Sequence, residues 1–408
     1  MLLGAACLLQ GAPARANEWA SCVKELRTIA LGKGIGAQVF DSALAGVEPD
    51  ADILKLFDNQ PEFTIPIWDY LSGLVDDERV ADGRALMEKW SAVLAQAEEK
   101  FGVDRFVIAA VWGVESDYGR IMGRRELVRS LTTLSCSGRR QAFFRGELLA
   151  TLRILQSGDI PAASLVGSWA GAFGQTQFMP STYQRLAIDF DGDGRRDIVD
   201  SVPDALGSTA NYLKRAGWIT GQPWGYEVRL PANYAGPAGR RTKQSLAQWS
   251  ELGIRQVDGS ALTGSGPAGL LLPSGAKGPA FIVFRNFDAI FAYNAAESYA
   301  LAIAHLADRL RGGGAFRTPW PTDDPGIGRA QRREVQQRLL DRGFDVGVPD
   351  GIVGARTRTA IRAFQASAGL PQDGRAGMRV LQALRAAGPD PRVERAPGVD
   401  PAVAPRPK

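Results

Sequence analysis

The segment 106–115 reads FVIAAVWGVE, in which nine uncharged residues are followed by a glutamate. The apolar spacing is helical, and the lack of charge on any face predicts a helix that is buried on all sides. A carboxylate at the end of such a helix loses hydration, which favours its neutral form and raises its pKa. Glu115 therefore meets the condition for a general acid at neutral pH. A structural ion pair between Glu115 and Arg120 or Arg124 is the alternative.

A second carboxylate, Asp117, follows two residues later. In a helix this spacing points the two side chains to different faces. Asp117 is thus a poor partner for a glycosidase site with two carboxylates, because both groups must flank one bond in such a site. We expect Asp117 to be a solvated or capping residue.

The composition excludes several kinds of chemistry. The chain has 408 residues, of which 45% are apolar and 23% are charged, as in an ordinary soluble protein with two domains or a domain plus a small module. With His305 as the single histidine and three cysteines, a zinc site built on several such residues is nearly excluded. We assign His305 no role. The net charge of +4 is compatible with an anionic polymer, but no Lys/Arg run is dense enough to indicate nucleic acid.

The N-terminus has features of an export signal. Its first residues are mostly apolar, and Ala14-Arg15-Ala16 has the small-x-small form of a signal-peptidase site, so we expect residues 1–16 to be a signal peptide. An ordinary N-terminal helix is the alternative, and Cys7 is a weak candidate for a lipoprotein cysteine. Cys22 and Cys136 would remain after cleavage, either as a disulfide or as two separately buried thiols.

The rest of the chain divides into regions that differ in residue composition and hydrophobic pattern. Residues 17–311 have mainly helical patterns and should form one large domain, with a strand-rich insert at 222–285. Residues 312–328 begin with three glycines, contain several prolines and are typical of a linker. Three short apolar stripes separated by glycine-containing turns predict a three-helix unit at 329–387. The proline-rich residues 388–408 should be a disordered tail. The expected fold class is mainly α (α+β).

The segment 168–180, SWAGAFGQTQFMP, is the second candidate for chemistry. Its small residues let a backbone approach a ligand closely. Its hydroxyl and amide groups offer neutral donors and acceptors, and its aromatic rings offer flat faces for sugar rings. A plain buried helix-turn segment has the same composition and is the alternative.

The segment 189–197, DFDGDGRRD, matches the start of an EF-hand calcium loop. Gly194 stands at loop position 6, where the sharp turn requires glycine. Position 12 is Asp200 instead of the usual glutamate, and Asp204 competes with it as the closing ligand. We expect a structural calcium ion and no organic cofactor. The other oxygen ligands would come from Asp189, Asp191 and Asp193 and from the carbonyl of Arg195.

The segment Phe291-Ala292-Tyr293-Asn294 and the nearby Tyr299 form a further candidate. Tyrosine and asparagine side chains can orient a substrate or the carboxyl group of a glutamate. A capped helix start with a half-buried tyrosine explains the same residues.

Taken together, these segments resemble the membrane-bound lytic murein transglycosylase B family. The resemblance extends from about Trp19 to Leu310, and its motifs follow one another in the order of that family. The motifs are VWGVESDYGRIMG (111–123), LTTLSCSGRR (131–140), SWAGAFGQTQFMPSTY (168–183), DFDGDGRRDIVD (189–200) and FRNFDAIFAYNAAESYA (284–300).

The resemblance implies a lysozyme-like helical catalytic domain with a small mixed insert. It also implies cleavage of the β-1,4 bond between N-acetylmuramic acid and N-acetylglucosamine in peptidoglycan, leaving a 1,6-anhydro ring. By resemblance Glu115 is the catalytic acid and base, and Asp204 is favoured over Asp200 as the closing metal ligand. The implied substrate-binding residues are Ser168, Gln177, Arg139, Arg140, Tyr212, Tyr293, Asn294 and Tyr299.

Residues 343–377 resemble the three-helix peptidoglycan-binding module. The signature is a pair of Asp-Gly turns, Asp350-Gly351 and Asp373-Gly374. Gly354-Ala355-Arg356-Thr357 stands where the module normally reads Gly-Pro-x-Thr, which is a mild departure. A C-terminal peptidoglycan-binding domain is therefore expected.

A single carboxyl would suffice for this reaction, because the substrate supplies its own nucleophiles. Glu115 would protonate the glycosidic oxygen, the 2-acetamido group would stabilise the sugar cation, and Glu115 would then take the proton of the C6 hydroxyl as that oxygen closes on C1. Two rival functions are a muramidase that uses water and a non-catalytic wall-binding protein. We expect glycan strands of peptidoglycan, and also cell-wall synthesis or division proteins, as partners. The expected location is the periplasm, with the outer membrane or the wall as an attachment site.

Overall fold

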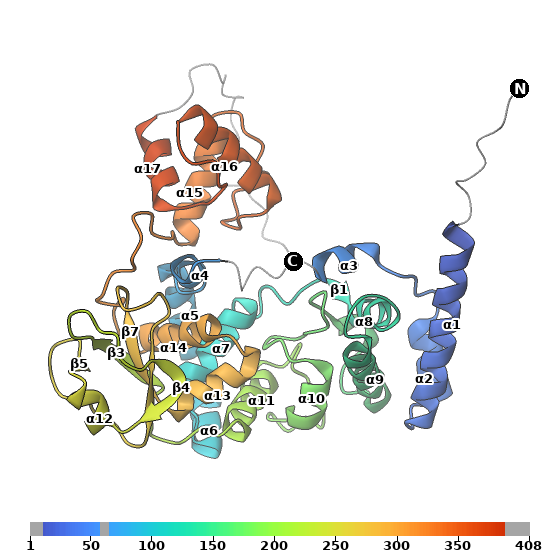
Figure 1. Cartoon of the computed structure of the whole chain (residues 1–408). Coiled ribbons are helices and arrows are strands. Elements are labelled where there is room, and N and C mark those ends of the chain that lie inside the picture. The colour runs from blue at the N-terminus through green and yellow to red at the C-terminus, as the bar shows by residue number, and fades with distance from the viewer. Residues whose placement is uncertain (1–10, 58–64, 388–408) are drawn as a thin grey trace, which may run out of the picture. The chain divides into compact units, whose positions relative to one another are not determined.

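The structure is a computed structural model that describes residues 11–57 and 65–387 (Figure 1). It divides into two compact units. The larger unit comprises the chain up to Ile65 and Arg79–Pro319, and the smaller unit comprises Pro66–Glu78 together with the chain from Trp320 onward. Cys7 and the predicted tail at 388–408 lie outside the described residues. The side chains of the predicted signal cleavage site at Ala14-Arg15-Ala16 are not described either.

The larger unit is mainly helical, which confirms the predicted fold class. Of the helices in the described residues, none combines the length and the apolar character that crossing a bilayer requires. The helices of this unit are α1 (Gly11–Gly32), α2 (Ala37–Leu44), α3 (Ala51–Phe57), α5 (Asp77–Lys89, which starts in the smaller unit), α6 (Ser91–Phe101), α7 (Arg105–Ser116), α8 (Leu127–Cys136), α9 (Gln141–Ser157), α10 (Pro180–Leu186), α11 (Val202–Arg215), α12 (Leu246–Glu251), α13 (Arg285–Asn294) and α14 (Glu297–Arg311).

Helix α7 is the buried helix that the segment 106–115 predicts. It begins at the cap residue Asp104, whose carboxylate accepts a hydrogen bond from the Phe106 amide at 2.8 Å. Seven consecutive residues from Val107 to Gly113 are buried, and the helix packs against α6, α11 and α14 (Figure 1). It ends where Asp117 adopts the left-handed conformation, with φ of 53°. Glu115 is therefore held in the last turn of a helix that is fixed on several sides.

The end of the larger unit's helical region forms two consecutive helices, α13 and α14. Ala295 stands between them in the left-handed conformation, with φ of 49°, which ends α13. The break places Tyr293 near the end of one helix and Tyr299 in the first turn of the next. The two tyrosines can therefore face the same site from different directions.

The insert forms a five-stranded antiparallel sheet, as its β-rich segments predict. The order of the strands is β4-β6-β7-β3-β5, and Val228 of β3 lies opposite Ala280 of β7. Val228, Ala280 and the side chain of Trp249 are buried in the core of the insert. The strands are β3 (Gly225–Arg229), β4 (Gly239–Gln244), β5 (Arg255–Gln256), β6 (Ala268–Leu271) and β7 (Ala280–Val283).

A short ladder brings two candidate segments together. Strand β1 (Arg125–Glu126) pairs antiparallel with β2 (Val166–Gly167). Gly123, just before β1, has φ of 93°, and a Cβ there would lie 2.1 Å from the carbonyl oxygen of Gly167. Glycine at position 123 therefore permits the close approach of the segment that follows Glu115 to the segment that begins at Ser168.

Cys22 and Cys136 form a disulfide, so the structure decides between the two alternatives that the sequence left open. The Cα atoms are 5.8 Å apart, which is an ordinary separation for a disulfide. The bond joins α1 to the last residue of α8. It thereby ties the N-terminal helix to the core of the larger unit.

The predicted linker starts with a segment that packs on the larger unit. The ring of Phe316 lies between Phe281, at a centroid distance of 4.8 Å, and His305, at 3.9 Å. The Glu227 carboxylate accepts the backbone N–H groups of Arg317 and Thr318 at 2.8 and 2.7 Å. Phe316 and Thr318 are thus anchored, and His305 is a buried residue that stacks on this segment.

The smaller unit contains the predicted three-helix module. Its helices are α15 (Arg329–Leu340), α16 (Ala355–Ser367) and α17 (Met378–Ala386), with α4 (Ile67–Leu74) from the earlier part of the chain. Residues 66–78 lie inside the range predicted for the catalytic domain but pack with this module. The Arg375 guanidinium explains the attachment, because it binds Asp69 at 2.6 Å and also pairs with Asp324.

Candidate active site

Glu115 lies in the last turn of α7, and burial is the main influence on the pKa of its carboxyl group. Its side chain is only partly accessible, and the Tyr299 hydroxyl donates a hydrogen bond to its Oε1 atom. Burial raises the pKa of Glu115, the hydrogen bond from Tyr299 lowers it, and the balance places the pKa at about 7. A substantial fraction of Glu115 is therefore protonated at neutral pH.

Three predicted tyrosines gather beside this carboxyl. Tyr293 stacks on Tyr299 at a centroid distance of 6.3 Å, and Tyr212 of α11 lies 4.5 Å from Tyr293. Burial raises the pKa of Tyr212 and Tyr293, and the nearby charge of Glu115 adds to both shifts. The Tyr293 hydroxyl donates to the Thr176 carbonyl at 2.7 Å. The phenols thus form an aromatic wall that stays neutral around Glu115.

Asp117 is engaged in ion pairs and does not serve as a second acid at the site. It is buried, so the expectation of a solvated residue was wrong, whereas the expectation of a capping residue is confirmed. Its carboxylate lies 3.4 Å from the Arg79 guanidinium and 3.0 Å from that of Arg120. Arg120 also binds Asp82 at 2.5 Å. The alternative ion pair of Glu115 with Arg120 is therefore not the arrangement in the structure, since Arg120 pairs with the aspartates.

The segment that starts at Ser168 folds as successive tight turns, and α10 begins at its last residue, Pro180. The Ser168 hydroxyl accepts the Ala172 amide at 3.0 Å. Gln177 has φ of 49°, and its amide donates to the carbonyls of Gly174 at 2.8 Å and Met122 at 3.1 Å. Gln177 thereby joins this turn to the loop that follows Glu115. The left-handed backbone of a non-glycine residue here is typical of a functional segment.

The acidic loop brings three of its carboxylates together. One oxygen from each of Asp189, Asp191 and Asp204 lies within 4.8 Å of the other two. Asp204 is fully buried and accepts the amides of Phe190 and Asp197 at 2.7 Å each. Asp204 therefore closes the loop from the start of α11. The predicted position-12 alternative, Asp200, is exposed.

The remaining predicted residues lie elsewhere on the larger unit. Arg139 and Arg140 are exposed in the turn between α8 and α9, and the Arg140 guanidinium stacks on Phe143 at 4.4 Å. Asn294 is the exposed last residue of α13, next to Tyr293. Of the predicted substrate-binding residues, the tyrosines are the ones that the structure brings to Glu115.

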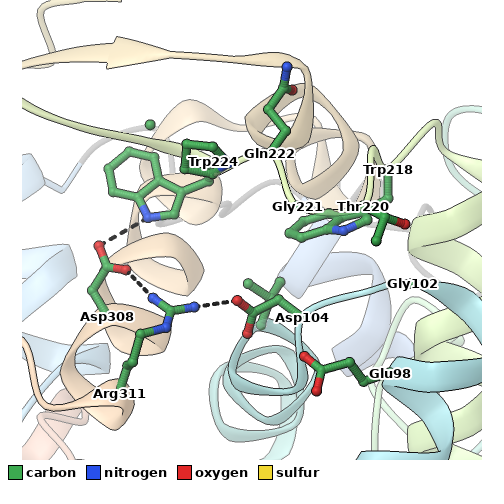
Figure 2. A pocket seen from close by; sticks show the side chains of 13 residues that line it. Glu98, Gly102, Asp104, Trp218, Thr220, Gly221, Gln222, Trp224, Asp308 and Arg311 are labelled. Carbon is green, nitrogen blue, oxygen red and sulfur yellow. Dashed lines mark hydrogen bonds and ion pairs between the residues drawn. The ribbon is translucent and has the colours of Figure 1, made fainter. Parts of the chain in front are cut away.

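A hollow of about 460 Å³ lies at the opposite end of α7, roughly 16 Å along the helix from Glu115. Figure 2 shows that three of its charged side chains, Asp104, Asp308 and Arg311, are joined in one chain of ion pairs. Arg311 pairs with Asp104 and with Asp308, and Asp308 accepts the Trp224 indole N–H at 3.0 Å. These polar groups have partners within the hollow, which lies at a junction between α7 and α14 and is distant from Glu115.

Three residues around Glu115 were missed by the reasoning from sequence: Trp112, Ser116 and Gln175. Gln175 accepts a hydrogen bond from the Trp112 indole at 3.0 Å, and its carbonyl accepts one from the Ser116 hydroxyl. Gln175 lies within the segment 168–180 that the sequence singled out. Its type and position gave no sign that it would contact α7, because that contact joins residues far apart in the chain.

Comparison with known proteins decides the family. A family model described as "Transglycosylase SLT domain" matches residues 18–308. The chain belongs to the SLT transglycosylase family. A second model, "Putative peptidoglycan binding domain", matches residues 328–384 of this SLT transglycosylase. Both resemblances inferred from the motifs are thus confirmed.

Individual relatives agree with the assignment to the SLT transglycosylases. The chain is 32% identical over 291 residues to the membrane-bound lytic murein transglycosylase B of Escherichia coli (strain K12), a match that covers 68% of this chain and 79% of that protein. SltB3 from Pseudomonas aeruginosa, crystallised with NAG-anhNAM-pentapeptide, is 47% identical, with a TM-score of 0.73 over 90% of this chain and 99% of that one. The Escherichia coli transglycosylase Slt35 in complex with calcium is 31% identical, with a TM-score of 0.64 over 71% of this chain and 92% of that one.

Proposed function

We propose that Glu115 is the single acid and base of a lytic transglycosylase reaction on peptidoglycan. The chain is a lytic transglycosylase of the murein transglycosylase B and SltB type. The observation that carries the assignment of Glu115 is its environment: a sheltered carboxyl with a pKa of about 7 that contacts a phenol. The cleaved bond is the β-1,4 linkage between N-acetylmuramic acid and N-acetylglucosamine.

The reaction proceeds in two proton transfers through the same side chain. Protonated Glu115 donates its proton to the glycosidic oxygen, and the C1–O bond breaks, which frees the N-acetylglucosamine hydroxyl. The 2-acetamido group of the muramic acid stabilises the positive charge at C1. The Glu115 carboxylate then takes the proton of the C6 hydroxyl while that oxygen bonds to C1. The product is a 1,6-anhydro ring, and Glu115 regains its proton.

Tyr299 and burial support the two halves of this cycle. The Tyr299 hydroxyl donates to Glu115, which stabilises the carboxylate that forms after the first proton transfer. Desolvation disfavours the charged form of Glu115 and thereby favours the protonated form before the first proton transfer. The buried ion pairs of Asp117 are consistent with this reaction, because no second carboxylate has to activate a water molecule.

We further propose that the tyrosine wall and its surroundings bind the glycan. Tyr212 and Tyr293 offer ring faces. Ser168 and Gln177 stand on the turn whose residue Gln175 binds Ser116, the residue that follows Glu115. The exposed guanidinium groups of the α8–α9 turn would contact carboxylates of the peptidoglycan peptide. The complete set of proposed substrate-binding residues is Ser168, Gln177, Arg139, Arg140, Tyr212, Tyr293, Asn294 and Tyr299.

The acidic loop has the donor chemistry of a structural calcium site. Carboxylate oxygens are preferred calcium ligands, and those of Asp189, Asp191 and Asp204 converge. The closing ligand would be Asp204, with Asp193 and the Arg195 carbonyl completing the set. A bound ion would neutralise the mutual repulsion of these groups and brace the loop. Slt35, a relative with this domain, has been crystallised with calcium.

The likeness to peptidoglycan-active relatives suggests where the protein works. Peptidoglycan lies outside the cytoplasmic membrane, so we propose a periplasmic location, with attachment to the outer membrane or the wall. The disulfide between Cys22 and Cys136 is compatible with that oxidising compartment. The C-terminal module would hold the enzyme on glycan strands. Cell-wall synthesis or division proteins are proposed as further partners.

Replacement of Glu115 by glutamine tests the proposed function. Glu115→Gln keeps the shape of the side chain but removes the transferable proton, so cleavage of purified sacculi should be abolished while circular dichroism stays unchanged. The matched control is Glu147→Gln, at another carboxylate of the larger unit, which accepts hydrogen bonds from the Ser181 amide and hydroxyl. That variant should lose stability but keep activity per folded molecule. Near-normal cleavage by Glu115→Gln would show that the assignment is wrong.

A further inference from the structure

The last turn of α7 is held by a buried glutamine that the proposed chemistry does not use. Gln175 is only 6% exposed, although it carries a polar amide. Its backbone and its side chain both make hydrogen bonds inside the protein. A buried amide with all of these partners satisfied specifies one local arrangement and excludes others.

Gln175 contacts α7 on both sides of the catalytic carboxyl. Its Oε1 atom accepts the Trp112 indole N–H at 3.0 Å, three residues before Glu115. Its carbonyl accepts the hydroxyl of Ser116, the residue that follows Glu115. The same Ser116 oxygen accepts the Gly119 amide at 2.8 Å. The turn that carries Glu115 is therefore bracketed by one residue from another segment.

The side-chain amide nitrogen and the backbone N–H of Gln175 bind the segment that follows the acidic loop. Its amide nitrogen donates to the Val199 carbonyl at 3.0 Å, and its backbone N–H donates to the Ile198 carbonyl at 2.9 Å. The adjacent residue, Asp197, donates its amide to Asp204 at 2.7 Å. Gln175 thus connects the end of α7 to the segment that Asp204 holds in place.

The end of α7 needs such support because its backbone is strained. Asp117 and Tyr118 are consecutive non-glycine residues with φ of 53° and 59°. Left-handed conformations of this kind persist only where the surrounding contacts impose them. They begin two residues after Glu115, so a relaxation of this turn would move the carboxyl.

We propose that Gln175 is a positioning residue for Glu115, which fixes the direction and the burial of the carboxyl by clamping Trp112 and Ser116. This inference rests on the proposed function of Glu115. Gln175 itself does not touch the reacting atoms. Its contribution is the geometry of the acid, and small displacements of a catalytic group have large effects on rate.

The test is Gln175→Met, which preserves side-chain length and removes both side-chain hydrogen bonds. We expect kcat on sacculi to fall by about tenfold or more while KM changes by less than about twofold. The displaced Glu115 would be better hydrated and would lose its proton at lower pH, so the alkaline limb of the kcat–pH profile should move to lower pH.

The control is Gln184→Met on α10, where a partly buried glutamine donates to the Ala150 carbonyl at 3.2 Å. This variant loses an amide hydrogen bond in the same unit but should keep kcat and the pH profile. If Gln175→Met behaves like Gln184→Met, with lower thermal stability alone, Gln175 is only structural and the inference is wrong.

A second variant covers the case in which Gln175→Met does not fold. Ser116→Ala removes the hydroxyl that binds the Gln175 carbonyl and leaves the glutamine in place. It should lower kcat and move the alkaline limb in the same direction, and an unchanged kcat with an unchanged profile would overturn the inference. The test also separates this inference from the proposed function. If Glu115→Gln remains active, the proposed function is wrong. If Glu115→Gln is inactive but Gln175→Met has a normal kcat and pH profile, only the positioning role is wrong.

Discussion

The hydroxyl of Tyr299 donates a hydrogen bond to Oε1 of Glu115, although the two residues are separated by 184 positions in the chain. The packing of α7 against α14 creates this contact. Burial and the hydrogen bond act on the pKa of Glu115 in opposite directions, and burial has the larger effect. A substantial fraction of Glu115 is thus protonated at neutral pH, and in the proposed mechanism Tyr299 would stabilise the carboxylate that the first proton transfer forms.

Tyr299→Phe should change both the rate and its pH dependence. A hydrogen bond to a charged group contributes about 1.5–3 kcal/mol, so loss of this bond from the developing carboxylate should lower kcat by roughly 10- to 100-fold. Because the bond lowers the pKa of Glu115, its removal should raise that pKa and move the alkaline limb of the kcat–pH profile to higher pH. The measurement is kcat against pH on purified sacculi.

Tyr234→Phe is the control for the loss of a phenol hydroxyl. The hydroxyl of Tyr234 donates to the Pro237 carbonyl at 2.6 Å in the strand-rich insert. The profile of this variant should match that of the wild type. A shift of the Tyr299→Phe limb to lower pH would contradict the assigned hydrogen bond.

Calcium should stabilise the larger unit through the acidic loop. Ligands that bind only the folded state raise its Tm, so titration with calcium should raise Tm and a chelator should reverse the effect. The rise should be much smaller in Asp191→Asn, because Asp191 belongs to the convergent triad. Asp193→Asn should lose less of the rise, since Asp193 lies outside that triad. Equal shifts in the wild type and in Asp191→Asn would exclude this loop as the calcium site.

The disulfide should contribute measurably to stability. It joins residues that are 114 positions apart, and removal of a native disulfide typically costs about 2–5 kcal/mol. The double variant Cys22→Ala/Cys136→Ala should therefore unfold at lower denaturant concentration than the oxidised wild type. A reducing agent should lower the Tm of the wild type but leave that of the double variant unchanged. A wild type that is insensitive to reduction would contradict this prediction.

The C-terminal module contains the same hydrogen-bonded arrangement twice, a lock in which a buried glutamine binds both residues of an Asp-Gly turn. Gln336 accepts the Gly351 amide at 2.7 Å and donates to Asp350 at 3.1 Å. Gln365 accepts the Gly374 amide at 2.9 Å, and its own amide donates to the aspartate of that second turn. The two Asp-Gly pairs of the sequence signature are therefore held by the same device.

Gln365→Met should loosen the second turn. It leaves the Gly374 amide without its acceptor in a buried place, which costs about 1–3 kcal/mol. Hydrogen exchange of peptides from residues 360–380 in the full-length protein should become faster. The control is Gln337→Met, because Gln337 is exposed and its amide donates to Asp341, the residue that caps the C-terminus of the same helix, at 2.9 Å. Equal exchange in both variants would show that the lock is dispensable.

The elements that the sequence predicted are those whose local conformation is determined by residues close together in the chain. The uncharged run before Glu115 is a buried helix because nothing on its surface favours water. The acidic loop and the Asp-Gly turns follow from local backbone requirements for glycine and for oxygen donors. These features depend on spacing within a few residues, so they can be read from the chain directly.

The features that sequence reasoning missed depend on contacts between distant segments. Asp117 looked solvated because its partner Arg79 lies 38 positions away, in a different helix. The attachment of residues 66–78 to the smaller unit depends on Arg375, more than 300 positions further along. The contacts of Gln175 with Trp112 and Ser116 likewise depend on which faces of α7 meet the turn at 168–180. Such pairings follow from the fold as a whole, and local patterns do not encode them.

Mass spectrometry of the muropeptides released from sacculi tests the central claim most directly. Wild-type protein should release products with a 1,6-anhydro end, each lighter by one water than the corresponding reducing product, and Glu115→Gln should release none. Reducing ends from the wild type would identify a hydrolase that uses water, and anhydro products from Glu115→Gln would show that another group carries the proton.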